Sequence, residues 1–286
     1  MSLPLWHIRI ALFAVLTLAL PSGSTPEKPV RVRLVEGLTH GFLALRTLDG
    51  EILADGDLFQ TAHGAHVTSH LVFHFKDGSE SEESVVFSQR AEFRLLKYHL
   101  VQKGPSFPHP LDFTIDPSKK EVTVHYSEDG KEKVVSEHPD LPADIANGMV
   151  LILLKNISPE TPETKVAMLA ATPKPQLVRL LISHQGEDSF RVNGSNRKAI
   201  HYVIKVEIGG VKGLIAPIVG KQPPDVHVWI AGGEAPTFVK SEGPLYLGGP
   251  IWRTELVSPV WPRASSGDSK DDSKGKDDKD KDKSRH

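Results

Sequence analysis

Asp-Ile-Ala-Asn-Gly-Met-Val-Leu-Ile-Leu-Leu, residues 144–154, is the apolar stretch around which the rest of the chain must fold. Its residues at positions i, i+4, i+7 and i+8 mark one helical face: Ile145, Met149, Ile152 and Leu153. The second half is apolar on every side, which favours burial of a helix of about 14 residues over a membrane span. We expect the helix to begin at Asp140 or Pro142, and Gly148 to let another backbone approach closely.

Strand patterns and tight turns lie on both sides of this stretch. Asp-Gly pairs at 49–50, 77–78 and 129–130 stand between apolar runs, the strongest short signal for a hairpin. Before the helix the candidate strands are residues 30–35, 67–75, 84–89, 93–102, 113–115, 121–126 and 132–136. After it they are 165–171, 176–184, 188–192, 199–208, 225–231, 235–242 and 251–257. The segment 199–208 alternates clearly between two faces, with Tyr202 and Ile204 on one and His201 and Val203 on the other.

This order of elements predicts an α+β, mainly β fold. Strands, one apolar helix and then more strands favour an antiparallel sheet, and a sheet with one apolar face needs a cover. We therefore predict a strongly curved antiparallel sheet or incomplete barrel, with the apolar helix in its concave face. The expected single domain covers residues 25–262.

The two ends differ from this body. Residues 1–24 are typical of a signal peptide, since Arg9 precedes an apolar run at 10–20 that is too short to span a bilayer of about 30 Å. An uncleaved anchor is the alternative. Residues 263–286 are mostly Ser, Gly, Asp and Lys, which predicts a disordered charged tail. Its mixed charges argue against a nucleic-acid arm, so an electrostatic contact in the envelope is the alternative to a solvated tail.

Composition narrows the class of protein. The formal net charge of −2 gives no reason to expect nucleic acid as a partner, and 39% hydrophobic residues suffice for a core. The chain has no cysteine, so disulfides, thiolate nucleophiles and zinc–cysteine sites are excluded. An exported chain of this size without disulfides is expected in the periplasm of a Gram-negative-type bacterium.

A histidine cluster at His63, His66, His70 and His74 is the most conspicuous candidate for chemistry. On a helix three of them would align and could bind a metal. The β-branched and aromatic neighbours indicate a strand, on which residues four apart are about 13 Å apart, too far to share one ion. We therefore expect a polar histidine face on this strand, with Leu71, Phe73 and Phe75 on the other, and no metal or cofactor.

The sequence matches neither the phosphate-loop motif nor the nucleophile motif of serine hydrolases. Gly220-Lys221 is followed by Gln222, so it is no phosphate loop, and no Ser stands in a Gly-x-Ser-x-Gly elbow. Ser183 and His184 are adjacent, so on a strand they point to opposite faces. Hydrolysis of an ester remains the enzymatic alternative, but we do not expect an enzyme.

The arrangement resembles uncharacterised bacterial periplasmic proteins related to the lipoprotein-localisation carrier superfamily. The resemblance covers roughly residues 30–257 and rests on the signal peptide, the long strand at 93–102, the apolar helix and the strand at 225–230. It implies a half-barrel of antiparallel strands around an apolar concave face, with helices as a lid. It implies no site residues.

The predicted function is binding of an acyl chain, lipid or lipidated peptide in an apolar groove. The Gly/Pro-rich segment 209–225 is either a flap over that groove or a connection tucked against the core. The groove candidates are Ile145, Met149, Ile152, Leu214, Ile218 and Trp229. Peripheral contact with a membrane and a protein partner in the envelope are compatible with this function. The alternative is an envelope scaffold or protein-interaction module with a filled core and no small ligand.

Overall fold

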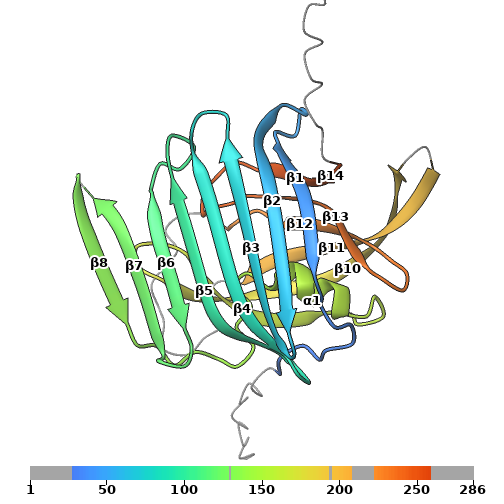
Figure 1. Ribbon diagram of the computed structural model, residues 1–286, viewed down its shortest axis with the longest axis horizontal. Helices are drawn as coiled ribbons and strands as arrows, with labels where there is room; N and C mark the ends of the chain where they lie inside the picture. Colours follow the sequence, from blue (N-terminus) through green and yellow to red (C-terminus); the bar gives the residue numbers. More distant parts are fainter. Residues whose placement is uncertain (1–27, 129, 193–194, 208–221, 259–286) are drawn as a thin grey trace, which may run out of the picture.

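The residues that the structure describes form one open antiparallel sheet of 14 strands that curls around one short helix (Figure 1). The computed structural model describes residues 28–128, 130–192, 195–207 and 222–258. The predicted signal peptide at 1–24 and the predicted tail at 263–286 lie outside these ranges. Residues 208–221, including Leu214 and Ile218, lie outside them as well.

Most strands lie where the sequence predicts them, but the two strands that flank the predicted Asp-Gly turn at 49–50 were not among the candidates. Before the helix they are β1 (Thr39–Arg46), β2 (Ile52–His63), β3 (His66–Phe75), β4 (Glu80–Gln89), β5 (Phe93–Lys103), β6 (Leu111–Asp116), β7 (Glu121–Glu128) and β8 (Lys131–Glu137). After the helix α1 (Val150–Asn156) they are β9 (Thr164–Ala170), β10 (Gln176–Val192), β11 (Ser195–Glu207), β12 (Val226–Ala231), β13 (Thr237–Gly243) and β14 (Trp252–Val257). The two strands expected at 176–184 and 188–192 are one strand, β10, with a register shift between His184 and Gly186. Only an isolated bridge at Arg31 forms where a strand at 30–35 is expected.

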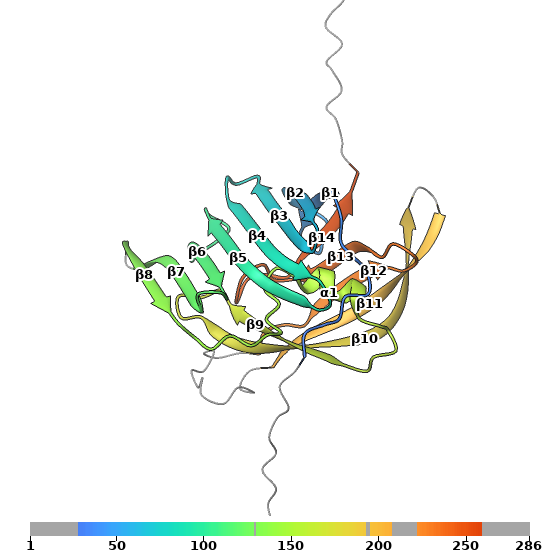
Figure 2. The same ribbon diagram turned by 60° about the horizontal axis from the view of Figure 1, so that its bottom comes forward.

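The sheet order is β8-β7-β6-β5-β4-β3-β2-β1-β14-β13-β12-β11-β10-β9. Each half is a meander of neighbouring strands, and β14 joins the halves by pairing with β1. Figure 2 shows the sheet curving around α1, with β8 and β9 as its two ends. The prediction of a curved antiparallel sheet that does not close into a barrel, with the helix in its concave face, is confirmed.

Two apolar clusters fill much of the concave side. The larger one joins α1 and the residues before it to inward-facing side chains of β3–β7 and β9–β12. The smaller one lies between β1, β2, β3 and β14, where Phe107 and Trp252 pack against Phe75. The helix therefore works as an internal plug between the two halves of the sheet.

The helix is half as long as the sequence suggests. It has seven residues, and Gly148 just before it has a φ of +70°, which interrupts the helical pattern. A Cβ at Gly148 would lie 2.9 Å from the Val85 Cβ and 3.0 Å from the Tyr98 ring, so the close approach at this glycine is made by side chains and not by the backbone that the sequence analysis expects. Leu151 is 36% exposed while Ile152, Leu153 and Leu154 are buried. Among the described residues, no helix has the length and apolarity needed to cross a membrane.

The residues before α1 cover the free edge of β9 instead of forming a helical turn. Ala146 N–H donates to the Ala167 carbonyl at 2.8 Å, and Ala167 N–H donates to Asp144 Oδ2 at 3.1 Å. Asn147 exchanges two hydrogen bonds of 2.9 Å with the backbone of Leu169. This edge strand is therefore paired by the chain itself.

Candidate ligand cavity

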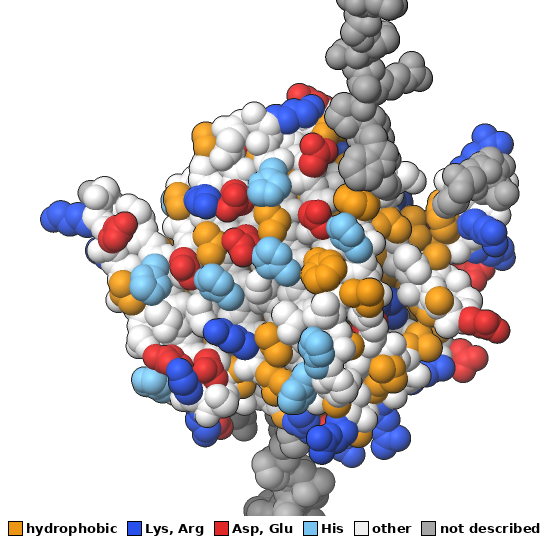
Figure 3. Space-filling model, in the orientation of Figure 1, with side chains coloured by type: hydrophobic (Ala, Val, Ile, Leu, Met, Phe, Trp, Pro, Cys, Tyr) orange, Lys and Arg blue, Asp and Glu red, His pale blue; other side chains and the backbone are white. Residues whose placement is uncertain are grey.

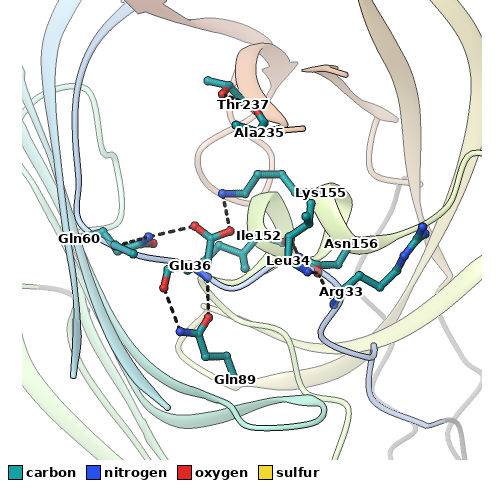
Figure 4. Close-up of polar contacts among 11 residues, drawn as sticks. Arg33, Leu34, Glu36, Gln60, Gln89, Ile152, Lys155, Asn156, Ala235 and Thr237 are labelled. Carbon is teal, nitrogen blue, oxygen red and sulfur yellow. Dashed lines mark hydrogen bonds and ion pairs between the residues drawn. The ribbon is translucent and has the colours of Figure 1, made fainter. Parts of the chain in front are cut away.

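The end of α1 is tied to the segment before β1 by a buried polar network (Figure 4). Lys155 Nζ lies 2.5 Å from Glu36 Oε1, and Gln60 Nε2 donates to Glu36 Oε2 at 3.0 Å. Gln89 pairs with the Glu36 backbone, accepting from its N–H at 2.7 Å and donating to its carbonyl at 2.9 Å. The buried carboxylate is therefore compensated by one cation and one amide, as a buried charge requires.

Asn156 fixes the neighbouring backbone in the same way. Its Oδ1 accepts from the N–H groups of Arg33 and Leu34, both at 2.8 Å, and its Nδ2 donates to the Ile152 carbonyl at 3.0 Å. The segment at residues 33–36 is thus held across the C-terminal turn of α1. This contact sets one wall of the adjacent cavity.

A cavity of about 310 Å³ opens beside these contacts. Its wall combines the end of α1, the segment at residues 33–34, strands β11 and β12, and the connection between β12 and β13. The lining residues are Arg33, Leu34, Leu154, Lys155, Ile157, Pro159, Ile200, Tyr202, Ile230, Gly232, Gly233 and Pro236. Five of these residues are aliphatic, two are prolines and two are glycines, and they share the lining with Tyr202 and two cationic residues. Arg33 comes from the segment before β1 and Lys155 from α1.

Tyr202 anchors the base of the cavity. Its hydroxyl donates to the Ile157 carbonyl at 3.0 Å, so the buried phenol is satisfied. Burial raises the pKa of Tyr202 above its ordinary value, and the positive charge of Arg33 acts in the opposite direction. The phenol therefore stays neutral at physiological pH, and Arg33 carries the charge at this wall.

The structure separates the six residues expected to line a groove. Ile145, Met149 and Ile152 are buried in the larger apolar cluster, where they pack against the chain itself. Trp229 alternates with Val228 and Ile230, which face that cluster, so its side chain lies on the opposite face of the sheet. Leu214 and Ile218 lie outside the described residues.

Sequence reasoning missed the residues that do line the cavity. The two-faced pattern of β11 places Tyr202 on the inner side, and Ile200 shares that face two residues earlier. Arg33, Leu34 and Lys155 carry no such signal, because their positions depend on side-chain contacts between segments more than 100 residues apart. The apolar face of β11 was therefore the one signal in the sequence that indicated residues of this cavity.

The convex face of the first six strands carries a repeated pairing of histidine with carboxylate. His40–Asp57, His70–Glu82 and His99–Asp112 join β1 to β2, β3 to β4 and β5 to β6, with N···O distances of 2.8–2.9 Å. Figure 3 shows histidines and acidic side chains interspersed over this face. The predicted histidine face of β3 is confirmed, with Phe73 and Phe75 buried on the other side. Within the described part of the chain, no three His, Asp or Glu residues are placed to hold a metal ion.

A second convex cluster surrounds Trp229. The His201 ring stacks on Trp229 with centroids 4.4 Å apart, and Lys240 Nζ lies 4.0 Å from the Trp229 ring centroid. Trp229 Nε1 donates to Asp188 Oδ2 at 2.7 Å, and His201 Nε2 lies 2.9 Å from His227 Nδ1. Burial lowers the pKa of His201, and the adjacent His227 lowers it further. The stacking and the hydrogen bonds therefore engage these side chains with one another.

Comparison with known protein families found no match, and a search of curated proteins found none either. Among solved structures the chain is similar to a protein from Brucella abortus described as a beta-barrel-like protein of domain of unknown function DUF1849. The TM-score is 0.44 and the sequence identity 9%, over 80% of this chain and 100% of that chain. The description of that protein names no ligand.

Proposed function

We propose that the protein binds one acyl chain, carried by a fatty acid, lipid or lipidated peptide, in the cavity beside α1. The observation that carries this proposal is that five aliphatic side chains line that cavity together with the cationic side chain of Arg33. Its volume lies at the lower end of the range of about 300–1,000 Å³ found for ligand sites, so it suits a single chain. Binding of this kind needs no catalytic group, and we propose a carrier and not an enzyme.

The two cations at the wall differ in what they offer a ligand. Lys155 is already engaged by the buried Glu36 carboxylate. Arg33 makes no ion pair with any residue that the structure describes, and its side chain is exposed. A guanidinium in this position suits an anionic headgroup, because its planar donors match carboxylate and phosphate oxygens.

A chain-length series tests the apolar part of the proposal. Each buried methylene contributes about 0.8 kcal/mol, which is about fourfold in affinity, until the cavity is full. We expect affinities from competition with a fluorescent fatty acid to rise with chain length and then level off. Ile200→Ala enlarges the cavity and should move the plateau to longer chains. Val203→Ala, on the other face of the same strand, should leave it unchanged. Affinity that is independent of chain length contradicts the proposal.

The headgroup is tested separately. Arg33→Gln should weaken binding of a fatty acid by about tenfold, the order of one charge-assisted hydrogen bond. Binding of the corresponding alcohol should change little. Arg31→Gln is the matched control, since Arg31 is exposed on the same segment and does not line the cavity. If Arg33→Gln lowers the affinity for the fatty acid and for the alcohol equally, Arg33 does not bind the headgroup.

We further propose that the chain is exported to a bacterial periplasm and acts there. The charged and apolar pattern of residues 1–24 and the absence of cysteine support this location. N-terminal sequencing of protein recovered from a periplasmic extract tests it, with cleavage near Ser24 as the expected result. A chain that keeps Met1 and stays with the membrane fraction contradicts it.

The filled concave face favours a second function, an envelope scaffold or protein-interaction module without a small ligand. Residues that would line a wide groove, such as Ile145 and Met149, pack against the chain itself and are 3% and 1% exposed. Cross-linking in cells should then return a protein partner, while native mass spectrometry of the purified protein shows no bound lipid. The two measurements together separate the carrier from the scaffold.

A further inference from the structure

The two ends of the sheet are treated differently by the chain. The free edge of β9 is covered by residues 144–147, as described above. The free edge of β8 pairs with no strand among the described residues, and Figure 1 shows it at the outer end of the sheet. A bare edge of seven residues presents unpaired backbone donors and acceptors, which is a template for another strand.

The sequence of this edge is complementary to itself when read antiparallel. Lys131-Glu132-Lys133-Val134-Val135-Ser136-Glu137 places a cation at one end, an anion at the other and valine at the centre. Pairing two copies about Val134 overlaps the whole strand and sets Lys131 of each copy opposite Glu137 of the other. Neither Lys131 nor Glu137 makes an ion pair within the described ranges of the chain, so both charges are available.

Other features of β8 fit the same pairing. Val134 is 59% exposed, and in this register it meets its own copy, so a large exposed apolar side chain becomes covered. Lys133 is already paired with Glu128 on β7 and needs no partner from the second copy. A lysine-bearing edge discourages unrelated strands, whereas a strand with acidic residues at the matching positions is accepted.

We propose that β8 is the docking edge for a second copy of this chain, with the two β8 strands antiparallel about Val134. The contact is isologous, because each copy uses the same strand, and it closes as a two-fold dimer. It joins two open sheets into one continuous sheet and leaves the cavity beside α1 free.

A single cysteine tests the register directly, because the chain has none of its own. Residues directly opposite in an antiparallel pair have Cα atoms about 4.5–5.5 Å apart, within reach of a disulfide. Val134→Cys should give a disulfide-linked dimer under mild oxidation. Lys131→Cys alone should not, since the two copies of position 131 would be about 20 Å apart, whereas a mixture of Lys131→Cys and Glu137→Cys chains should cross-link. Val35→Cys, at a position 74% exposed, is the control for random collision.

Charge reversal tests the same contact without cysteine. Lys131→Glu and Glu137→Lys should each raise the dimer dissociation constant measured by sedimentation equilibrium, and the double variant should restore it. Far-ultraviolet circular dichroism confirms that each variant folds. A wild-type chain that is monomeric at all concentrations, or Val134→Cys that cross-links no faster than Val35→Cys, overturns the proposal. Cross-linking through Val134→Cys to a different protein in cells, with no dimer in vitro, also overturns it.

Discussion

The side-chain amide of Asn147 takes the place of a neighbouring strand for Leu169. Its Nδ2 donates to the Leu169 carbonyl and its Oδ1 accepts from the Leu169 N–H, both at 2.9 Å. Asn147 is buried, as is Leu169, so water is not available to replace either bond. One side chain therefore satisfies both backbone groups on an edge strand and holds the segment before α1 against it.

Substitution of Asn147 should be costly for this reason. Asn147→Ala leaves a donor and an acceptor unsatisfied, at about 1–3 kcal/mol for each group. Asn147→Asp keeps the acceptor for the Leu169 N–H but places a buried carboxylate oxygen where Nδ2 donates to the Leu169 carbonyl, so it should also destabilise the fold. The free energy of unfolding from urea titration measures both. A loss below about 0.5 kcal/mol for Asn147→Ala, the scale of an ordinary surface change, would contradict this role.

Gly148 offers a prediction with an internal control. Gly148→Ala requires a left-handed backbone for a residue with a Cβ, at about 1–2 kcal/mol, and also places that Cβ 2.9 Å from Val85. Gly130 has a nearly identical φ of +71°, and nothing lies within 4 Å of the added Cβ. Gly130→Ala should therefore cost only the backbone term. Equal losses of stability for Gly148→Ala and Gly130→Ala would mean that Val85 on β4 moves away from the added Cβ at no measurable cost.

The Glu36–Lys155 pair should behave as a buried ion pair. Removing one partner by Lys155→Met leaves the buried Glu36 carboxylate without a cation and should destabilise the fold by about 3–5 kcal/mol. Adding Glu36→Gln to that variant should recover most of the loss, because no uncompensated charge remains. Urea denaturation of the wild type, both single variants and the double variant gives the coupling energy. Additive losses in the double variant would show that the two charges do not depend on each other.

Most of the sheet could be read from local sequence. Asp-Gly turns at 49–50 and 77–78 and alternation in strands such as β3 and β11 locate hairpins, because both signals depend only on neighbouring residues. The concave position of the apolar stretch followed from its burial requirement. These signals do not depend on how the two halves of the sheet meet.

The site and the helix length depended on long-range contacts and could not be read in this way. Helical spacing at 144–154 suggested a longer helix, but Asp144 and Asn147 bond to β9 and Gly148 adopts a positive φ. Trp229 looked like a groove residue because it is large and apolar. Its partners on the convex face, His201 and Lys240, are on other strands. Nothing in the sequence indicates that they lie next to Trp229.

His201 predicts a loss of stability in mild acid. Its pKa in the folded protein lies below the ordinary value of about 6.5, chiefly because of burial and next because of His227. The unfolded chain therefore binds the proton more readily, so the free energy of unfolding should fall as pH drops below about 6.5 and stay constant above it. Asp188 and Glu242 oppose this shift, whereas Lys240 adds to it.

Unfolding by urea between pH 5 and 8, for the wild type and His201→Phe, measures the contribution of this residue. The phenylalanine keeps a ring to stack on Trp229 but cannot titrate, so the decline in stability below pH 6.5 should be shallower in the variant. His66→Phe, at an exposed histidine on β3, is the control and should follow the wild type. A wild type and a His201→Phe variant with parallel pH profiles would show that His201 accepts its proton as readily in the folded as in the unfolded chain.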